Sequence, residues 1–360
     1  MEMTKKSKIT YHIRISARIW TILITIFISG FSPYVIVAQT AGTVQPFGEG
    51  ITAKKFFSSM VDKDNILWFL TETGVISFDG AKWVLHNTNP KVVSTGIKDI
   101  AYDVTSNGKE LWLVSHTGVT VASLPFEAKS GVTTLKTENS KILSNNVLAL
   151  ATGKNELMWF GTDKGISALK NGKWLTNSYD DRYPETIFQN FPITALATSI
   201  NGDSLYIGSQ GSGVMRVYRN DLDAVSGASE YLGWGPILMP SDSVYSIHIT
   251  TDGTQWIGTN RGVAKHTGYK TLEGWIVYTS ADGLANDLVQ AICSDSKGNM
   301  YFGTKNGLSV FDGTKWTSYR VKDGLASNNI LSISIDNKDC VWLGTDNGVT
   351  SFIQGKFTCY

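Results

Sequence analysis

Four residues of this sequence have side chains suited to acid–base chemistry and stand at the same place in a repeated phrase. They are Glu72, His116, Asp163 and Asp346. Carboxylates and imidazoles that converge on one point can transfer protons or activate a metal-bound water, so these four define one hypothesis, a lyase or hydrolase. They lie at least 44 residues apart in the chain. Only the fold can therefore bring them together.

The same position of the phrase carries other polar side chains elsewhere in the chain. These are Gln210, Asn260 and Lys305, and Arg261 follows directly after Asn260. Residues that vary at one point of a constant frame indicate a ring of recognition residues. The alternative interpretation is plain turn chemistry, because polar residues suit any turn. Both interpretations stay open at this stage.

Longer connections between the repeats add four further candidates for ligand binding. Tyr179, Arg182 and Tyr183 fall in one of them, and Trp234 falls in the longest, at 220–243. Long loops on a rigid scaffold are where function concentrates. The other ten tryptophans divide into one in the N-terminal segment and nine in regular positions of the repeat. Those nine are interpreted as packing residues.

Other site chemistries find no support in the sequence. The histidines form no pair with metal-ligand spacing, and no Gly-rich phosphate loop or nucleophile elbow occurs. Of the three cysteines, Cys340 and Cys359 are expected on the second and outer strands of one sheet, too far apart for a disulfide. Cys293 lies in a different repeat. We predict no catalytic residue, no metal, no cofactor and no disulfide.

The repeated phrase determines the fold that must position these residues. An aromatic residue is followed by a hydrophobic residue, often Gly, then Thr or Ser, two polar residues and Gly. The seven copies begin at Trp68, Trp112, Trp159, Tyr206, Trp256, Tyr301 and Trp342. Successive aromatics are 41 to 50 residues apart. A period of this length, in segments rich in β-branched and aromatic residues, is typical of propeller blades.

One copy shows the expected order of strands. Strands are predicted at 289–293, 300–303, 308–311 and 315–319, separated by turns that contain Gly298, Gly307 and Gly313. The sequence therefore predicts an all-β fold, a seven-bladed β-propeller with four antiparallel strands per blade, over residues 43–360. Residues 43–47 look like an additional outer strand that covers the edge of the last blade.

The N-terminal segment differs from the rest of the chain. Residues 1–38 carry five basic residues against Glu2, followed by an apolar run and a small residue before Gln39. This pattern predicts a secretory signal peptide, with an uncleaved signal anchor as the alternative. The chain as a whole carries a net charge of +1, so the remaining 322 residues carry −3. We expect a periplasmic or secreted protein that binds no nucleic acid and meets a membrane only if this segment is retained.

Several repeats resemble the two-component regulator propeller repeat. Residues 282–286 read DGLAN and residues 301–308 read YFGTKNGL; residues 323–329 read DGLASNN and residues 342–349 read WLGTDNGV. The resemblance extends over nearly all of 43–360 and is weaker in the second and fourth copies. It implies the periplasmic sensor half of a hybrid two-component system, which is thought to sense glycans or other nutrients. No kinase or membrane segment is expected after the last repeat, so phosphotransfer within this chain is not expected.

Three functions follow as hypotheses. The first is an exported, non-catalytic, sensor-type propeller that binds a small molecule or glycan on its loops. The second is the lyase or hydrolase named above. The third is a scaffold that binds another exported protein through an apolar patch around Trp234, Ile237, Leu238 and Met239.

Overall fold

The computed structural model separates the chain into Met1–Gln39 and Thr40–Tyr360, and every strand lies in the second unit. The predicted signal segment at 1–38 lies outside the described residues. At 43–44, 97–105, 108–109, 218 and 229–233 only the backbone is described. The structure describes residues 43–45, 47, 50–86, 97–105, 108–123, 131–153, 157–175, 191–218, 229–233, 239–267 and 274–360.

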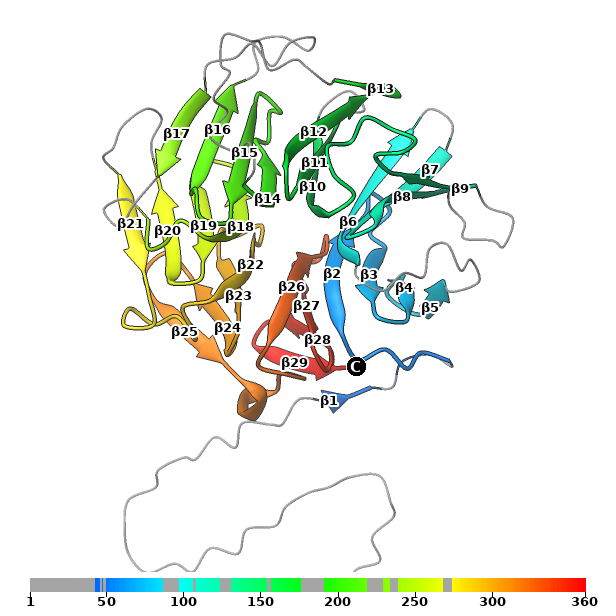
Figure 1. The fold of residues 1–360 in the computed structure, drawn as a ribbon. Helices are drawn as coiled ribbons and strands as arrows, with labels where there is room; N and C mark the ends of the chain where they lie inside the picture. Colours follow the sequence, from blue (N-terminus) through cyan, green and yellow to red (C-terminus); the bar gives the residue numbers. More distant parts are fainter. Residues whose placement is uncertain are drawn as a thin grey trace, which may run out of the picture. The chain divides into compact units, whose positions relative to one another are not determined.

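Seven antiparallel sheets stand around one axis, as Figure 1 shows. Each sheet is one blade, and its four strands follow one another in chain order from the axis outward. The first strand of every blade, here called the inner strand, contacts the inner strand of the next blade. The predicted seven-bladed β-propeller with four strands per blade is thus confirmed.

The strand bounds follow the predicted period. Blades 1 to 3 consist of β2 (Phe56–Val61), β3 (Leu67–Thr71), β4 (Gly74–Phe78) and β5 (Trp83–His86); β6 (Ile97–Thr105), β7 (Gly108–Ser115), β8 (Gly118–Ser123) and β9 (Val132–Leu135); and β10 (Val147–Gly153), β11 (Leu157–Thr162), β12 (Gly165–Lys170) and β13 (Lys173–Trp174). Blades 4 and 5 consist of β14 (Ile193–Thr198), β15 (Ser204–Ser209), β16 (Val214–Tyr218) and β17 (Ser229–Gly233); and β18 (Val244–Ile249), β19 (Gln255–Thr259), β20 (Gly262–His266) and β21 (Trp275–Tyr278).

Blades 6 and 7 complete the ring. They consist of β22 (Val289–Ser294), β23 (Met300–Thr304), β24 (Gly307–Phe311) and β25 (Trp316–Tyr319); and β26 (Ile330–Ile335), β27 (Val341–Thr345), β28 (Gly348–Ile353) and β29 (Lys356–Cys359), with a short 3-10 helix η1 (Val321–Asp323) between them. The strand bounds predicted for blade 6 agree with β22 to β25 within one residue at each end.

A hydroxyl side chain closes the turn between the second and third strands in all seven blades. In blade 1, Thr71 Oγ1 donates to the carbonyl oxygen of Gly74 at 2.8 Å, and Gly74 has a φ of 138° that favours glycine. The equivalent pairs are Ser115–Gly118, Thr162–Gly165, Ser209–Gly213, Thr259–Gly262, Thr304–Gly307 and Thr345–Gly348. This bond explains the Thr or Ser and the final Gly of the repeated phrase.

The glycine in the second strand of blades 3 to 7 lets neighbouring blades approach each other. A Cβ on Gly303 would lie 2.7 Å from Cγ2 of Ile330, the fully buried first residue of the next inner strand. The same relation holds for Gly161 with Ile193, Gly208 with Val244, Gly258 with Val289 and Gly344 with Phe56. Blade packing therefore leaves no room for a side chain at these positions.

The ring closes between blades 7 and 1. The short strand β1 (Thr43–Val44) pairs in parallel with β29 as a fifth strand of blade 7, which confirms the predicted edge cover. Phe47 follows it and packs against Phe56 and Trp83 of blade 1, with ring centroids 5.4 and 5.0 Å apart. It also contacts Tyr360. This N-terminal strand joins both sides of the seam.

The tryptophans of the repeated phrase are buried packing residues, as the sequence predicts. The five that open the repeated phrase are 3% to 8% exposed, namely Trp68, Trp112, Trp159, Trp256 and Trp342. In blade 1 the indole Nε1–H of Trp68 donates to Asp62 Oδ2 at 2.9 Å. Trp342 with Asp336 and Tyr301 with Asp295 repeat this pair. Trp234 lies outside the described residues.

Because burial disfavours the charged form of His248, we expect the protein to be less stable at acidic pH. Burial lowers the pKa of His248, which is linked to Ser294 Oγ at 2.8 Å, to about 4. An unfolded histidine titrates near pH 6.5, so between pH 6.5 and 4 the unfolded chain binds more protons than the folded one. The free energy of unfolding should therefore fall as the pH falls through this window, by up to about 3 kcal/mol for His248. Above pH 6.5 the effect is absent.

Urea unfolding of the wild type and of His248→Gln between pH 7.5 and 4.5 checks this expectation. The variant should lose less stability across the window than the wild type. Val321→Ala, which changes an exposed side chain with no titratable group, is the control and should keep the wild-type slope. Equal slopes for all three proteins would contradict the assignment.

Candidate ligand-binding face

One end of the propeller collects the turns in which the sequence places its candidate residues. These are the turns between second and third strands, and the crossovers that lead from an outer strand to the next inner strand. The two are joined by hydrogen bonds from turn glycines. The amides of Gly262, Gly307 and Gly348 each donate at 2.7 Å to a carbonyl in the crossover before the next inner strand. We call this end the loop face.

Eight of the twelve predicted site residues fall in the described part of the chain. Glu72, His116, Asp163, Gln210, Asn260, Arg261, Lys305 and Asp346 all lie in the turns of the loop face. Tyr179, Arg182, Tyr183 and Trp234 lie outside the described residues. The repeat therefore places the eight on a common face, one or two from each blade.

Glu72 holds the start of the first inner strand. Its Oε1 accepts the backbone N–H of Lys54 at 2.7 Å, and its Oε2 accepts that of Lys55 at 2.9 Å. These residues lead directly into β2. Because both oxygens already accept hydrogen bonds within the blade, the carboxylate is poorly placed to serve as a general base.

Asp346 has a similar structural role in blade 7. Its Oδ1 accepts from Ser327 Oγ at 2.5 Å, and its Oδ2 accepts from Asn329 Nδ2 at 2.9 Å. Partial burial opposes ionisation, but these two hydrogen bonds outweigh it and lower the pKa of the Asp346 carboxyl. The group is an ionised anchor that ties the turn to the crossover.

His116 and Asp163 meet around a residue of the crossover before blade 3. His116 Nδ1 lies 2.5 Å from Asn146 Oδ1, so a side chain from blade 2 reaches the crossover of blade 3. The backbone N–H of Asp163 donates to the carbonyl oxygen of Asn146 at 3.2 Å. The Oδ1 atom of Asp163 is buried and has no hydrogen-bond partner. Among the eight described candidates, His116 and Asp163 are thus brought to a shared neighbour.

The other four described candidates present exposed side chains on the same face. They are Gln210, Asn260, Arg261 and Lys305. Their backbones are fixed by the frame: the Gln210 amide donates to Pro192 O at 2.9 Å, and the Lys305 amide donates to Leu288 O at 3.1 Å. The main chain is thus held while the side chains remain available.

The structure adds a set of residues that sequence reasoning missed. The ladder between the first and second strands shifts register after the first residue of the inner strand in every blade. Such β-bulges redirect a side chain and are frequent beside functional sites. The bulged residues are Phe57, Lys98, Leu148, Thr194, Tyr245, Gln290 and Leu331. They stand where the inner strands begin at the loop face.

Two exposed aromatic side chains lie close to the starts of neighbouring inner strands. Tyr245, a bulged residue, is 40% exposed, and Phe191, two residues before β14, is 38% exposed. Thr194 Oγ1 donates to Val244 O at 2.6 Å, which links the starts of these two inner strands. In the sequence each bulged residue is a variable position between a hydrophobic residue and a residue that is Ala or Ser in six of the seven blades, and a single repeat does not reveal this pattern.

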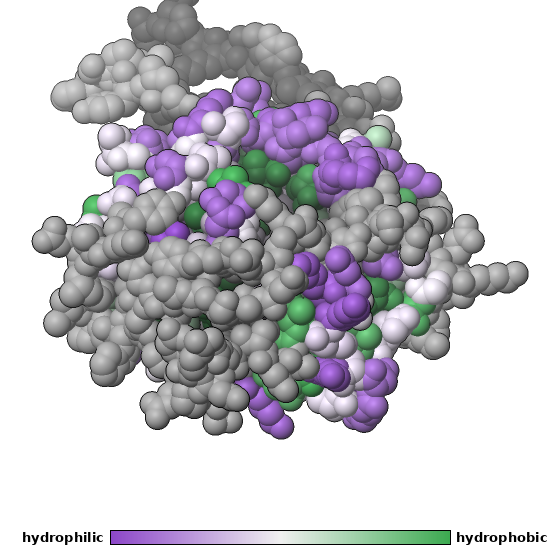
Figure 2. Space-filling model, turned by 90° about the horizontal axis from the view of Figure 1, so that it is seen from above, coloured by the Kyte–Doolittle hydropathy of each residue, from purple (hydrophilic) through white to green (hydrophobic). Residues whose placement is uncertain are grey.

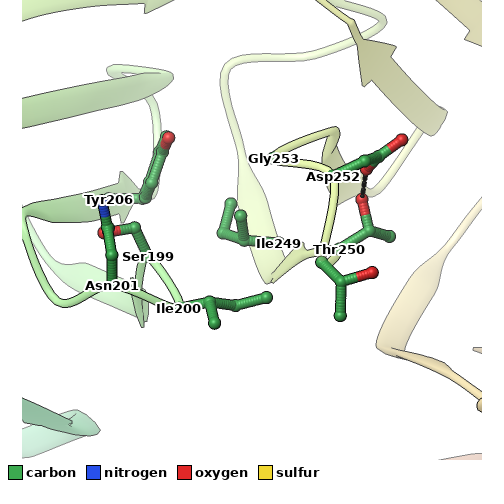
Figure 3. A pocket seen from close by; sticks show the side chains of 9 residues that line it. Ser199, Ile200, Asn201, Tyr206, Ile249, Thr250, Asp252 and Gly253 are labelled. Carbon is green, nitrogen blue, oxygen red and sulfur yellow. Dashed lines mark hydrogen bonds between the residues drawn. The ribbon is translucent and has the colours of Figure 1, made fainter.

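A small cavity opens at the opposite end of the propeller, where hairpins join first and second strands. It holds about 210 Å³ between blades 4 and 5, and Figure 3 shows its walls. It is lined by Ser199, Ile200, Asn201, Tyr206, Ile249, Thr250, Thr251, Asp252 and Gly253. Ser199 Oγ donates to Asn201 Oδ1 at 2.7 Å, and Thr250 Oγ1 donates to Asp252. Its polar groups thus largely bind one another, and none of the predicted site residues lines it.

The molecular surface and the thiols offer little else for chemistry. Among the residues drawn in colour in Figure 2, hydrophilic ones predominate, and hydrophobic ones show between them. Met239, placed by the scaffold hypothesis in an apolar patch, is fully buried. The three cysteines are free, and burial raises the pKa of Cys293 to about 11 and that of Cys340 to about 12. Within the described residues no three His, Cys, Asp or Glu side chains gather as metal ligands.

Comparisons with known proteins agree with this architecture. Residues 283–306 and 324–347 match the two component regulator propeller repeat. The fold matches the extracellular domain of a protein assigned as a hybrid two-component system from B. thetaiotaomicron, with a TM-score of 0.67 and 22% identity over 87% of this chain and 41% of that one. The chain thus spans about two fifths of the length of that relative. No curated protein sequence matches the chain.

Two other solved structures share the fold. PorZ, a surface component of the type-IX secretion system of Porphyromonas gingivalis, has a TM-score of 0.63 and 16% identity over 85% of this chain and 47% of its own. Virginiamycin B lyase from Staphylococcus aureus has a TM-score of 0.59 and 12% identity over 84% of this chain and 95% of its own. Identities this low establish the fold alone. In the described part of the chain, no helix is long and apolar enough to cross a membrane.

Proposed function

We propose that the chain is an exported sensor-type propeller that binds a small molecule or glycan on its loop face. The observation that carries the proposal is the set of seven bulges at the starts of the inner strands. Each bulge breaks a regular ladder at the same end of the molecule. The frame is constant and the bulged residue differs from blade to blade, which is the arrangement that ligand recognition needs.

The residues themselves support binding rather than catalysis. Glu72 and Asp346, two of the four acid–base candidates, use both carboxylate oxygens to hold their own blades. Exposed Tyr245 and Phe191 offer aromatic surface between the polar turns, and aromatic side chains combine apolar area with a polar edge. The basic, then apolar N-terminal segment and the extracellular or surface setting of the matched proteins support a periplasmic or secreted location.

Replacement of Tyr245 by alanine should weaken ligand binding without unfolding the protein. A panel of soluble oligosaccharides and short peptides is first screened against the wild type by thermal shift. A ligand at 100 times its dissociation constant stabilises a protein by about 2.7 kcal/mol, which moves the melting temperature by several degrees. We expect the Tyr245→Ala variant to bind the selected ligand at least tenfold more weakly, because it loses an exposed aromatic contact.

The control for this variant lies on the same blade. Ile276, on the outer strand β21, is 43% exposed and far from the inner strands in the order of the sheet. Ile276→Ala should bind like the wild type. A ligand whose affinity is unchanged by Tyr245→Ala but reduced by Ile276→Ala would place the binding surface on the rim and contradict the proposal.

A further inference from the structure

Two blades carry the same polar residues at the loop face, in the same order. Blade 3 has Ser144 and Asn146 before its inner strand and Asp163 in its turn; blade 7 has Ser327, Asn329 and Asp346 at the equivalent positions. In both blades the backbone N–H of the asparagine donates to the serine Oγ at 3.2 Å. The two sets therefore start from one backbone arrangement and can be compared atom by atom.

In blade 7 the serine and asparagine side chains are both hydrogen-bonded to the aspartate. Ser327 and Asn329 donate to the two oxygens of Asp346, so the carboxylate is satisfied from both sides. The Asn329 Oδ1 meanwhile accepts Gln290 Nε2 of blade 6 at 3.0 Å. Every strong hydrogen-bonding atom of the aspartate has a partner within the protein.

In blade 3 the same side chains stay apart. Asn146 is linked through its Oδ1 to His116 of blade 2, and neither Ser144 nor Asn146 donates to Asp163 within hydrogen-bond distance. The buried Oδ1 of Asp163 is left with no partner. A buried carboxylate oxygen without a donor is costly, and native proteins seldom leave one unless water or a ligand supplies the missing bond.

A group that satisfies all three side chains must both donate and accept hydrogen bonds. Asp163 Oδ1 requires a donor, whereas the Ser144 hydroxyl and the Asn146 amide offer donors that require an acceptor. A hydroxyl meets both conditions. An ammonium group cannot accept, and a carboxylate cannot donate and would be repelled by Asp163.

We infer that Ser144, Asn146 and Asp163 form a subsite for one hydroxyl group of a neutral polar ligand at the blade 2–blade 3 side of the loop face. This inference rests on the proposed function for the choice of face. The subsite itself rests on the contrast with blade 7. His116 belongs to it as a positioning residue, because its Nδ1 is hydrogen-bonded to Asn146 Oδ1.

The two aspartates should respond to the same substitution with opposite signs. Asp163→Asn replaces a carboxylate whose buried Oδ1 has no hydrogen-bond partner, so we expect an unchanged or higher melting temperature. Asp346→Asn replaces an acceptor of two hydrogen bonds, so we expect a fall of about 4 °C or more. Calorimetry of the three proteins without ligand measures this. A comparable fall in both variants would show that Asp163 is satisfied like its twin and would overturn the inference.

Binding is tested with three small probes of matched size. Propane-1,2-diol, propylammonium chloride and sodium propionate are titrated separately into the wild type while NMR follows the ring signals of His116. We expect saturable shifts with the diol alone, at least tenfold weaker in Asp163→Asn and unchanged in Ile276→Ala. Saturable shifts with the ammonium instead of the diol would overturn the hydroxyl assignment. The absence of saturable shifts with all three probes would also overturn it, and would leave a bound water only as the partner of Asp163 Oδ1.

This result is separable from the fate of the proposed function. The Tyr245→Ala experiment reports on the face without involving Asp163, Asn146 or Ser144. If Tyr245→Ala loses the screened ligand while the diol gives no shift, the face stands and the subsite fails. If the diol binds through Asp163 while Tyr245→Ala leaves the affinity for the screened ligand unchanged, the subsite stands and the wider proposal fails.

Discussion

Trp342→Ala should lower the free energy of unfolding by about 3 to 5 kcal/mol, the cost of removing a large buried aromatic side chain. Trp342 is 5% exposed and lies at the seam where blade 7 meets blade 1. Its ring centroid lies 5.3 Å from that of Phe78, 5.7 Å from that of Tyr360 and 6.2 Å from that of Trp83. The variant would lose these aromatic contacts and leave a cavity between blades 7 and 1, where the last blade of the chain meets the first.

The indole contributes through its N–H as well as through its volume. Trp342 Nε1 donates to Asp336 Oδ2 at 3.1 Å. Trp342→Phe keeps most of the ring and leaves the carboxylate without this donor, so a smaller loss of about 1 to 3 kcal/mol is expected. Val321→Ala, at an exposed position, should be nearly neutral. Urea unfolding followed by far-UV circular dichroism gives all three values, and a Trp342→Ala loss no larger than that of Val321→Ala would refute the packing account.

Gly344→Ala should also destabilise the closing seam, by about 1 to 3 kcal/mol, although it adds a single methyl group. The new Cβ would lie 2.3 Å from Ser332 Oγ and 2.7 Å from the carbonyl oxygen of Phe56. The serine hydroxyl can rotate away, but the backbone carbonyl of the first inner strand cannot move without shifting blade 1. The strain therefore falls on the contact between the two blades.

Gly131→Ala is the matched control. Gly131 lies outside the left-handed region, as Gly344 does, and the nearest atom to its new Cβ would be Ser123 Oγ at 3.7 Å. That distance is an ordinary contact, so the variant should match the wild type within experimental error or gain slightly. Thermal unfolding of both variants compares them directly. Equal melting temperatures would mean that the seam tolerates a side chain and that the glycine is not required by packing.

The architecture was predictable because its signals are local. The spacing of the phrase from Trp68 to Trp342 and the turn glycines fix the length of each strand within a single repeat. Thr304 and Gly307 illustrate this, since the bond that closes their turn joins residues three apart. Residues 43–47 were identified as an extra outer strand for a similar reason, because an exposed edge in the last blade needs a cover.

The candidate site was predictable only in outline. The sequence correctly placed Glu72 and Asp346 on the turns of one face, but their hydrogen-bond partners come from crossovers 17 to 19 residues away. The bulge at Tyr245 is a slip in pairing with a second strand and has no signature in one repeat.

Asp163 and Asp346 show the limit most clearly. Their local sequences are similar, yet both oxygens of Asp346 accept hydrogen bonds whereas the buried Oδ1 of Asp163 has no partner. The asparagine beside each is held by a different residue of the preceding blade, His116 in one case and Gln290 in the other. These contacts join neighbouring blades, and a single repeat read by itself does not contain them.

A crystal structure of the protein with the ligand selected by thermal shift tests the central claim most directly. The account predicts ligand density on the loop face, over the starts of the inner strands, in contact with Tyr245 or another bulged residue. Density in the cavity between Ser199 and Thr250 at the opposite end, with none on the loop face, would contradict it.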